Sequence, residues 1–465
     1  MTSVTVRGVW RDEVPEGNLD ARLLDGFTGA IGQSRVEQAA GDVIAVTGLG
    51  DRERATAAGL RLSASAAARR IAAALPQHPE AAVSVALTVD AESFASTVDP
   101  DAALAAVADG LLAGGYRFRM TGARTFVSDA VPVASGELSG VPGWRRGSAL
   151  GAAVNTARDL VNLPAAALTP ADFARWAKES LEPHGVGVAV RDAEELVANG
   201  YGGIIAVGQG ADNPPRLLEL TVGDASPEYA FVGKGVTFDT GGLSLKSSDA
   251  LMDMKSDMAG AAAVVAAFAL LPALAPGRSF AAVVPLVENM PGPGATRPGD
   301  VVTLRDGSTL EILNTDFEGR IILADALARA AELHPRAIVD IASLTYASRH
   351  ALGDEYAALV SNDDALAAEV VAAGDRSGDR AWRMPLQPEL EYQIRSDLAD
   401  YKNFPGVPHA RVSTAALLLS RFVGDIPWAH LDITGPCYRH ASDAFGAAGG
   451  TGYGVRLLAE LVRGA

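Results

Sequence analysis

The sequence predicts an α/β protein of two domains. We expect a smaller N-terminal α/β domain and a larger C-terminal α/β domain whose central mixed sheet is flanked by helices. Short apolar runs alternate with helical stretches along the chain, a pattern typical of α/β folds. A chain of 465 residues is long enough for two or three domains. The stretch 131–145, rich in proline, glycine and serine, reads as a linker.

The N-terminal part contains two apolar runs that predict strands, Val43–Val46 and Val83–Leu87. Helical stretches follow at roughly 52–75 and 101–113. The turn Gly48-Leu49-Gly50 begins like a dinucleotide-binding loop, but Glu53 stands where that loop needs a third glycine. We therefore interpret this segment as a tight strand-to-helix turn.

Beyond the linker, the sequence predicts a helix at 147–161 that ends before Pro164. The alternation of strands and helices then resumes. A long apolar helix is expected at 258–271, directly after Asp257, and another that starts near Ile321 and contains Asp325. Apolar runs predict strands at Ile204–Val207, Leu217–Val222, Tyr229–Val232, Ala281–Val287, Ala337–Ile341 and Trp428–Ile433. We expect domain boundaries at 1–145, 146–165 (an interdomain helix and linker) and 166–465.

Composition excludes several classes of function. The formal net charge of −17 and the absence of a Lys/Arg run argue against nucleic acid or an anionic membrane as the main partner. Cys437 is the single cysteine, so no intrachain disulfide can form, which fits a reducing cytoplasm. The N-terminus has no apolar signal core, and the most apolar stretch, Ala259–Leu271, is too short to span a bilayer. A cytoplasmic location is expected.

Two glycine-containing stretches concentrate acids and bases. The first is Gly233–Gly242, and the second is Asn314–Arg320. If the two meet in space, their carboxylates repel one another unless cations hold them together. Lysine and arginine side chains could supply that charge, and so could a pair of divalent metal ions. Carboxylate oxygens suit Mg²⁺ or Mn²⁺, and Zn²⁺ accepts them too.

The positions of these residues favour a site. Lys234 and Asp239 flank a short stretch at the end of a predicted strand, where active sites of α/β folds gather. Asp316 and Glu318 are two residues apart, so in extended chain both side chains point to one side. Purely structural roles for these acids remain possible alternatives to a catalytic or metal site. Asp257 could cap a helix, Asp239 could belong to a turn, and the other acids could lie in a solvated loop or form ion pairs with the lysines and Arg320.

Other catalytic patterns are missing. A phosphate loop would need Ser or Thr after the Gly-Lys pair, but Gly235 stands there. The sequence has no Gly-x-Ser-x-Gly elbow and no His-Glu-x-x-His. His430 lies within a predicted buried strand, so we interpret it as a core residue with satisfied hydrogen bonds.

Several motifs of this sequence resemble those of the leucyl aminopeptidase family of dinuclear metallo-exopeptidases. The most specific is Asn-Thr-Asp-Phe-Glu-Gly-Arg at 314–320. The resemblance covers about 158–465 and is only general over 1–150. The other matching segments are Gly233–Gly242, Met254–Met258, Arg158–Asn162, Arg297–Asp300 and Trp428–Ile433.

The resemblance implies two divalent metal ions per subunit, with zinc or manganese expected first and magnesium or cobalt as alternatives. Asp239 and Glu318 would bridge both ions. Lys234 and Asp257 would complete the tighter site. Asp316 would complete the more exchangeable site through its carboxylate and its backbone carbonyl.

It also implies a mechanism of peptide hydrolysis, with 166–465 as the catalytic domain. Arg320 would hold a bicarbonate ion that acts as general base, and Lys246 would stabilise the developing oxyanion. The expected substrates are peptides, from which N-terminal residues are released, and the expected assembly is a homo-hexamer. No nucleic-acid or membrane partner is expected.

The sequence departs from the family's pattern at two places. Phe317 stands where alanine is usual, and we expect it to pack rather than to take part in chemistry. The segment that lines the pocket for the substrate's first side chain is also changed. Its Tyr346 replaces a glycine and Ser343 a threonine, so the preferred N-terminal residue stays open. The expected pocket residues are Met254, Ser343, Leu344 and Tyr346.

Four functions remain compatible with these residues. The first is a cytoplasmic aminopeptidase of broad range. The second is a narrow dipeptidase with the same chemistry, for example one specific for Cys-Gly. The third is a DNA-binding or regulatory role, against which the net charge of −17 argues. The fourth is an inactive structural relative, but that reading requires a lost ligand, and all five expected ligands are present.

Overall fold

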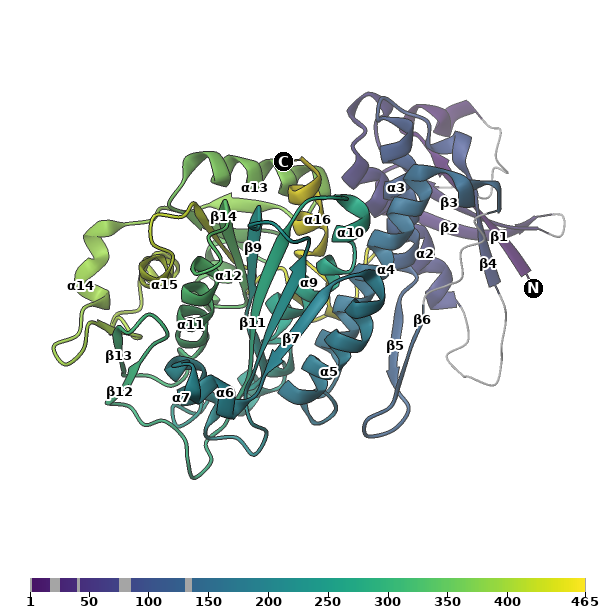
Figure 1. Cartoon of the computed structure of the whole chain (residues 1–465). Helices are drawn as coiled ribbons and strands as arrows, with labels where there is room; N and C mark the ends of the chain where they lie inside the picture. The colour runs from purple at the N-terminus through teal and green to yellow at the C-terminus, as the bar shows by residue number, and fades with distance from the viewer. Residues whose placement is uncertain (1, 17–25, 40–41, 75–84, 130–135, 465) are drawn as a thin grey trace. The chain divides into compact units, whose positions relative to one another are not determined.

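The computed structural model describes residues 2–16, 26–39, 42–74, 85–129 and 136–464 (Figure 1). The chain forms two compact units. The first comprises Met1–Asn155 with Arg439–Gly449, and the second comprises Thr156–Tyr438 with Gly450–Ala465. The division thus falls inside helix α4 (Pro142–Asn162), which the sequence predicts at 147–161.

The first unit is built on a four-stranded sheet in the order β2-β3-β1-β4. Strand β1 pairs in parallel with β3 and β4, whereas β2 is antiparallel to β3. Helices α2 and α3 pack on the sheet through small apolar side chains such as Ala64 and Ala67. The elements of this unit are β1 (Thr2–Val9), β2 (Ser34–Ala39), β3 (Asp42–Gly48), α2 (Ala57–Ala74), β4 (Val85–Asp90), α3 (Pro100–Gly114), β5 (Arg117–Met120) and β6 (Phe126–Asp129).

The predicted N-terminal strands and helices agree with this unit where the structure describes them, but the predicted linker ends earlier than 145, because α4 begins at Pro142. The strand at Val43–Val46 lies inside β3, and the helices at 52–75 and 101–113 correspond to α2 and α3. Residues 75, 83 and 84 of the predicted elements, and 131–135 of the linker, lie outside the described residues.

The second unit is built on a nine-stranded mixed sheet. The strand order is β16-β15-β18-β14-β9-β11-β8-β7, and β10 also pairs with β11. The central strands β18, β14, β9 and β11 are parallel, whereas β15, β8 and β7 introduce antiparallel pairs. This confirms the predicted mixed α/β sheet. Its strands are β7 (Gly187–Arg191), β8 (Arg216–Val222), β9 (Tyr229–Gly233), β10 (Gly235–Asp239), β11 (Phe280–Asn289), β14 (Ala337–Ala342), β15 (Ala357–Ser361), β16 (Ala381–Arg383) and β18 (Trp428–Asp432).

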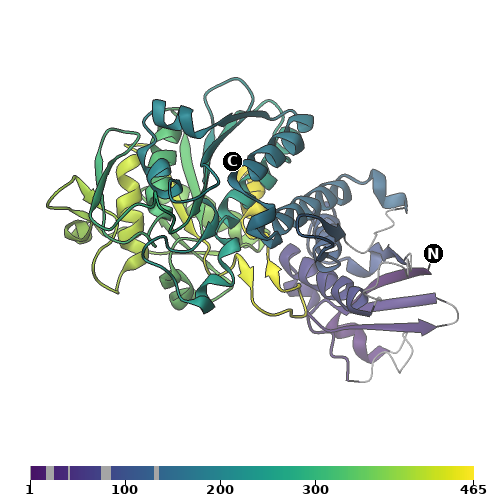
Figure 2. The same cartoon turned by 90° about the horizontal axis from the view of Figure 1, so that it is seen from below.

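Helices cover both faces of this sheet (Figures 1 and 2). Three short strands, β12 (Asp300–Thr303), β13 (Thr309–Ile312) and β17 (Tyr401–Lys402), form a separate small sheet. None of the helices in the described ranges is long and apolar enough to cross a membrane. The helices are α5 (Pro170–Leu181), α6 (Ala193–Ala198), α7 (Gly202–Gly208), α8 (Ser248–Leu251), α9 (Ala259–Phe268), α10 (Leu271–Leu274), α11 (Gly319–Ala331), α12 (Tyr346–Leu352), α13 (Asp364–Ser377), α14 (Glu391–Ile394), α15 (Arg411–Leu419) and α16 (Val455–Gly464).

The predicted strand at Ile204–Val207 is wrong, because this run belongs to helix α7. A Cβ on Gly202 would lie 2.0 Å from the carbonyl oxygen of Thr303, so this glycine allows the helix start to approach the neighbouring chain closely. The Asp325 carboxylate of α11 then accepts the Ile204 N–H at 2.9 Å. A four-residue apolar run cannot distinguish strand from helix by itself, and this tertiary cap favours the helix.

The predicted helix 258–271 is shorter than expected. Helix α9 ends at Phe268, and the separate turn α10 contains Pro272 near its start. Proline has no N–H to continue a helical ladder but fits the first turn of a new helix. The break therefore follows from Pro272.

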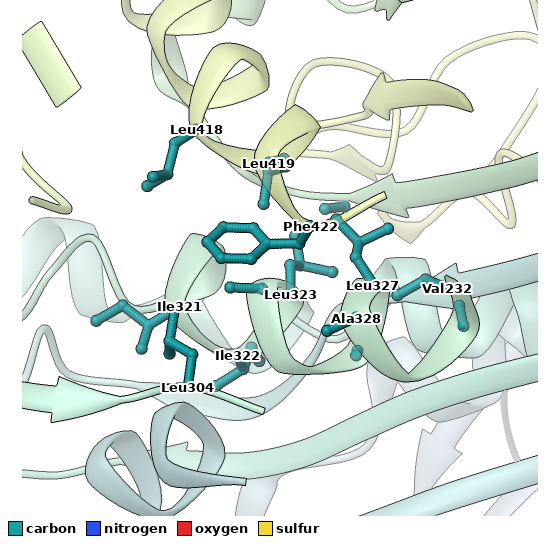
Figure 3. Packing of buried hydrophobic residues seen from close by; sticks show 14 of the residues in the cluster. Val232, Leu304, Ile321, Ile322, Leu323, Leu327, Ala328, Leu418, Leu419 and Phe422 are labelled. Carbon is teal, nitrogen blue, oxygen red and sulfur yellow. The ribbon is translucent and has the colours of Figure 1, made fainter. Parts of the chain in front are cut away.

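The core that positions the site surrounds α11 (Figure 3). Ile321, Ile322 and Leu323 at its beginning are at most 1% exposed, and Leu327 follows one turn later. They pack against Val232 of β9 and against Leu418, Leu419 and Phe422. This packing fixes the N-terminus of α11, which directly follows Glu318, against the central sheet.

Candidate metal centre

Three acidic side chains converge at the carboxyl ends of the central strands. Asp239 ends β10, whereas Asp316 and Glu318 lie directly before α11. One carboxylate oxygen from each lies within 4.8 Å of the other two. The two sequence motifs, about eighty residues apart, therefore meet in space.

Asp239 is held by its own loop and by the neighbouring strand. It is paired in register with Asn289 of β11, whose side-chain amide donates to Oδ1 at 2.8 Å. The backbone N–H of Gly241 donates to the same oxygen at 2.9 Å. Gly241 has φ +85°, and a Cβ there would lie 2.5 Å from the carbonyl oxygen of Ser244. The glycine is thus required for the turn that orients Asp239.

Asp316 and Glu318 reach the same cluster, but the backbone between them is not extended. The Asp316 N–H bonds to Asn314 Oδ1 at 2.8 Å, and the Phe317 N–H bonds to the Asn314 carbonyl oxygen. Glu318 already has helical dihedral angles of −70° and −35°, as the residue that precedes α11. The turn that Asn314 stabilises therefore brings the two carboxylates together. The alternation of side chains along an extended strand does not account for it.

Two lysines form ion pairs with the four acids of the cluster and balance part of their charge. The ammonium of Lys234 lies 2.7 Å from Asp257 Oδ1 and 2.9 Å from Glu318 Oε1, and it donates to the Ser343 carbonyl oxygen at 2.8 Å. The ammonium of Lys246 lies 2.9 Å from Asp239 Oδ2 and also contacts Asp316.

Asp257 belongs to the same network and does not cap a helix. Helix α9 begins at Ala259 after Met258, which makes no side-chain cap, and Asp257 lies one residue earlier. Its Oδ1 accepts from Lys234 and, at 2.8 Å, from the Ser343 hydroxyl. The alternative reading of Asp257 as a helix cap is therefore wrong.

The electrostatics of the cluster follow from burial and crowding. Burial opposes the charge on Lys234, but Asp257 and Glu318 outweigh that effect and raise its pKa. Burial raises the pKa of Asp316 to about 6, although Lys246 acts in the opposite direction. Burial also raises the pKa of Asp257, and the neighbouring acids Glu318 and Asp239 add to this. The carboxylates are thus short of positive charge despite both lysines.

The donor set fits divalent metal ions. Oδ2 of Asp257 and Oε2 of Glu318 are buried and have no hydrogen-bond partner among the described residues. A buried carboxylate oxygen without a donor is costly, and a cation removes that cost. The oxygens are hard ligands of the kind that Mn²⁺, Mg²⁺ and Zn²⁺ accept.

Arg320 lies beside this cluster as the second residue of α11. It is 2% exposed, and its only direct hydrogen bond among the described residues runs from Nη1 to the Asn403 carbonyl oxygen at 3.0 Å. Its guanidinium lies 4.6 Å from the centroid of the Phe317 ring. Phe317 also contacts Phe404 edge to face, so its ring packs as expected. Burial lowers the pKa of Arg320 to about 10.

The four expected pocket residues flank the network. Met254 starts the short turn that leads to Asp257. Leu344 follows Ser343, and its N–H lies 3.3 Å from Asp432 Oδ1. Tyr346 begins α12 and is 47% exposed. Burial raises the pKa of Tyr346, and the charges of Lys246 and three acids of the cluster also act on it.

Sequence reasoning missed several supporting residues. Asn289 orients Asp239 and also donates to the Thr315 carbonyl oxygen at 3.0 Å. Its place at the end of the predicted strand 281–287 was the available signal. The side chain of Asn403 donates to the Asn314 carbonyl oxygen, and its own backbone carbonyl oxygen accepts from Arg320 Nη1. Asn403 comes from a remote loop, and no local sequence pattern indicates it.

His430 is a core residue, as interpreted. It is fully buried, and its Nδ1 lies 2.6 Å from Asp340 Oδ1. The indole of Trp428 donates to the other oxygen of Asp340 at 2.7 Å. Its second ring nitrogen, Nε2, has no hydrogen-bond partner within the described residues, so the side chain is only partly satisfied.

Comparison with known proteins identifies relatives of the second unit. Residues 155–459 match the catalytic domain of the cytosol aminopeptidase family. A probable cytosol aminopeptidase of Syntrophotalea carbinolica is 42% identical over 372 residues, which cover 77% of this chain and 75% of the relative. One of Roseiflexus castenholzii is 41% identical over 381 residues, covering 78% and 77%.

Solved structures extend the similarity to the whole chain. The bottromycin maturation enzyme BotP in complex with Mn is 40% identical, with a TM-score of 0.87 over 99% of both chains. A cytosol aminopeptidase from Coxiella burnetii is 29% identical, with a TM-score of 0.84 over 100% of this chain and 97% of that one. The family resemblance of the motifs is thereby confirmed, and the chain belongs to the cytosol aminopeptidase family of metal-dependent exopeptidases.

Proposed function

We propose that this aminopeptidase uses two divalent metal ions held by Lys234, Asp239, Asp257, Asp316 and Glu318. The observation that carries the proposal is the convergence of three carboxylates within 4.8 Å around two buried lysines. The unpartnered carboxylate oxygens of the cluster support it, because they need a cation. When bound, such a pair of ions activates a water molecule and polarises the scissile carbonyl.

The ligands divide between two sites. Asp239 and Glu318 would be shared by the two ions, Lys234 and Asp257 would complete the tighter site, and Asp316 would complete the more exchangeable one through its carboxylate and its carbonyl oxygen. The greater exposure of Asp316, 29% of its side chain against 8% or less for the other acids, supports this division. Lys234 must lose a proton to bind a metal, so metal binding releases acid.

Lys246 and Arg320 act on the substrate's reacting atoms without binding metal. Lys246 contacts two ligands, Asp239 and Asp316, and becomes free to stabilise a developing oxyanion when cations take over their charge. Arg320 holds a bicarbonate ion that serves as general base. Its guanidinium group suits a small oxyanion, because it is planar and its buried Nε has no hydrogen-bond partner among the described residues.

The substrates are peptides with a free N-terminal amine. Manganese and zinc are the proposed ions, with magnesium and cobalt as alternatives, and the manganese complex of BotP supports the first. The proposed setting is a homo-hexamer in the cytoplasm. The net charge of −17 offers no attraction for nucleic acid or for anionic membranes.

A second candidate is an exopeptidase of narrow range, such as a dipeptidase or an enzyme that trims one defined peptide. Tyr346 favours this candidate, because a large side chain begins α12 at a position where the family has glycine. The match to a peptide maturation enzyme over 99% of both chains also favours it.

The test is hydrolysis of a panel of aminoacyl-amides and of Cys-Gly by metal-depleted protein with added Mn²⁺, Zn²⁺, Co²⁺ or Mg²⁺. We expect no turnover after exhaustive chelation and recovery with Mn²⁺ or Zn²⁺. Comparable rates on several amides would support the broad-range enzyme, and turnover of one substrate only would support the narrow one. Full activity in the presence of chelator would refute the metal mechanism.

A further inference from the structure

Two arginine side chains share one aromatic ring beside the metal centre. The guanidinium of Arg320 lies 4.6 Å from the centroid of Phe317, and that of Arg411 lies 5.5 Å from it. Phe404 packs edge to face on the same ring at 4.9 Å. Arg411 begins α15 directly after Ala410, which has φ +55°. This arrangement brings two positive charges to one side chain.

Neither guanidinium is neutralised. Among the described residues, no carboxylate lies in ion-pair contact with Arg320 or Arg411, and the Nε of each is buried without a hydrogen-bond partner. Two like charges held near one ring repel each other, and a guanidinium loses hydration on burial.

The nearby acids are engaged elsewhere. Glu318 and Asp432 act on Arg320 through space. Glu318 is in contact with Lys234, and Asp432 accepts hydrogen bonds from the Thr345 N–H and hydroxyl. Neither acid is in ion-pair contact with the two guanidiniums, so an anion that enters beside Phe317 would meet both of them without a direct competitor.

We propose that Arg411 is a second arm of the anion site at Arg320, so that both bind one small oxyanion beside Glu318. The ring of Phe317 stabilises both guanidiniums by cation–π contact and thereby fixes the pair. With two cations the site accepts not only a singly charged ion such as bicarbonate but also a doubly charged one such as sulfate. The use of the anion as a base rests on the proposed function, whereas its binding does not.

The test is isothermal titration calorimetry of the full-length, metal-loaded protein with sodium sulfate, which binds metal ions weakly. We expect bicarbonate to compete with sulfate in the wild type. Arg411→Gln should raise the Kd of sulfate about tenfold or more, because a charge-assisted pair is lost. Arg411→Lys should raise it less, since the charge stays and the planar fork is lost. Phe317→Ala should also weaken binding.

The matched control is Arg175→Gln, which changes a 63% exposed arginine on α5 and should leave sulfate binding unchanged. The proposal is overturned if Arg411→Gln or, should that variant not fold, Arg411→Lys binds sulfate as tightly as the wild type. It is also overturned if bicarbonate and sulfate bind without competing.

These outcomes are separate from those of the proposed function. An Arg411-dependent sulfate site in a protein that hydrolyses neither the aminoacyl-amides nor Cys-Gly with any of the four metal ions would count against the proposed function and keep the anion site. Normal hydrolysis combined with Arg411-independent sulfate binding would refute the anion site alone.

Discussion

At the scale of single residues, hydrogen bonds and ion pairs within the protein hold the proposed metal ligands in place. Asn289 and the Gly241 N–H hold Asp239, and Ser343 and Lys234 hold Asp257. The lysines thus stand in for the positive charge that the carboxylates require. A threonine-to-serine change at 343 keeps the hydroxyl that bonds to Asp257, which explains why this departure from the family is mild.

Tyr346 is the residue from which we predict substrate choice. Tyr346 replaces a glycine of the family's pocket, and its ring adds volume there, so bulky N-terminal side chains should be disfavoured relative to small ones. Tyr346→Gly should raise the ratio of kcat/KM for leucine-amide over alanine-amide about tenfold or more. Tyr346→Phe is the matched control, because it keeps the ring and removes only the hydroxyl, and it should leave the ratio near that of the wild type. An unchanged ratio in Tyr346→Gly would mean that the ring points away from the pocket.

At the scale of elements, α11 connects the core to the site. Its apolar side packs under the central sheet, its N-terminus follows Glu318, and its Asp325 accepts the backbone N–H groups of Ile204 and Arg305. One buried carboxylate therefore ties α7 and the β12–β13 turn to the helix that presents the catalytic residues.

Asp325 makes the stability of the fold depend on pH. Burial raises its pKa to about 7 in the folded protein, above the value near 3.9 of an unfolded chain. The folded state therefore holds this proton more tightly. Its stabilising contribution is complete below about pH 4 and is lost as pH rises through 7, with an upper bound of about 4 kcal/mol.

Urea unfolding of the wild type and of Asp325→Asn between pH 4.5 and 8 checks this prediction. The free energy of unfolding of the wild type should fall relative to that of the variant as pH rises. Asp364→Asn, which changes a side chain that is 91% exposed, is the control and should follow the wild type. Parallel pH curves for wild type and Asp325→Asn would show that this carboxylate titrates normally.

At the scale of the whole molecule, the sequence predicted the strands that form continuous apolar runs, such as β9, β11 and β14. It could not predict their order in the sheet, because strand pairing depends on contacts between remote segments. The run Ile204–Val207 was misassigned because its cap, Asp325, lies more than a hundred residues later.

The site was predictable to a similar degree. Its charged residues are concentrated in two short motifs, and the resemblance to a known family gave their roles. Asn289 and Asn403, which bond to those groups, and Arg411, which lies over the Phe317 ring, come from other segments and become neighbours only through the fold. Phe317 was expected to pack, but nothing local to it predicted that it would face two arginines.

The proposed site holds two metal ions without histidine or cysteine, and Glu318 is their shared ligand. The most direct test of this proposal is the metal content of purified Glu318→Gln, measured by mass spectrometry after dialysis, together with its turnover. The control is Glu332→Gln, at the other end of α11 and 40% exposed. We predict two ions per chain and full activity in the control. In Glu318→Gln we predict at most one ion, no turnover and retained folding, because one bridging charge is removed. Two ions and normal turnover in Glu318→Gln would contradict the account.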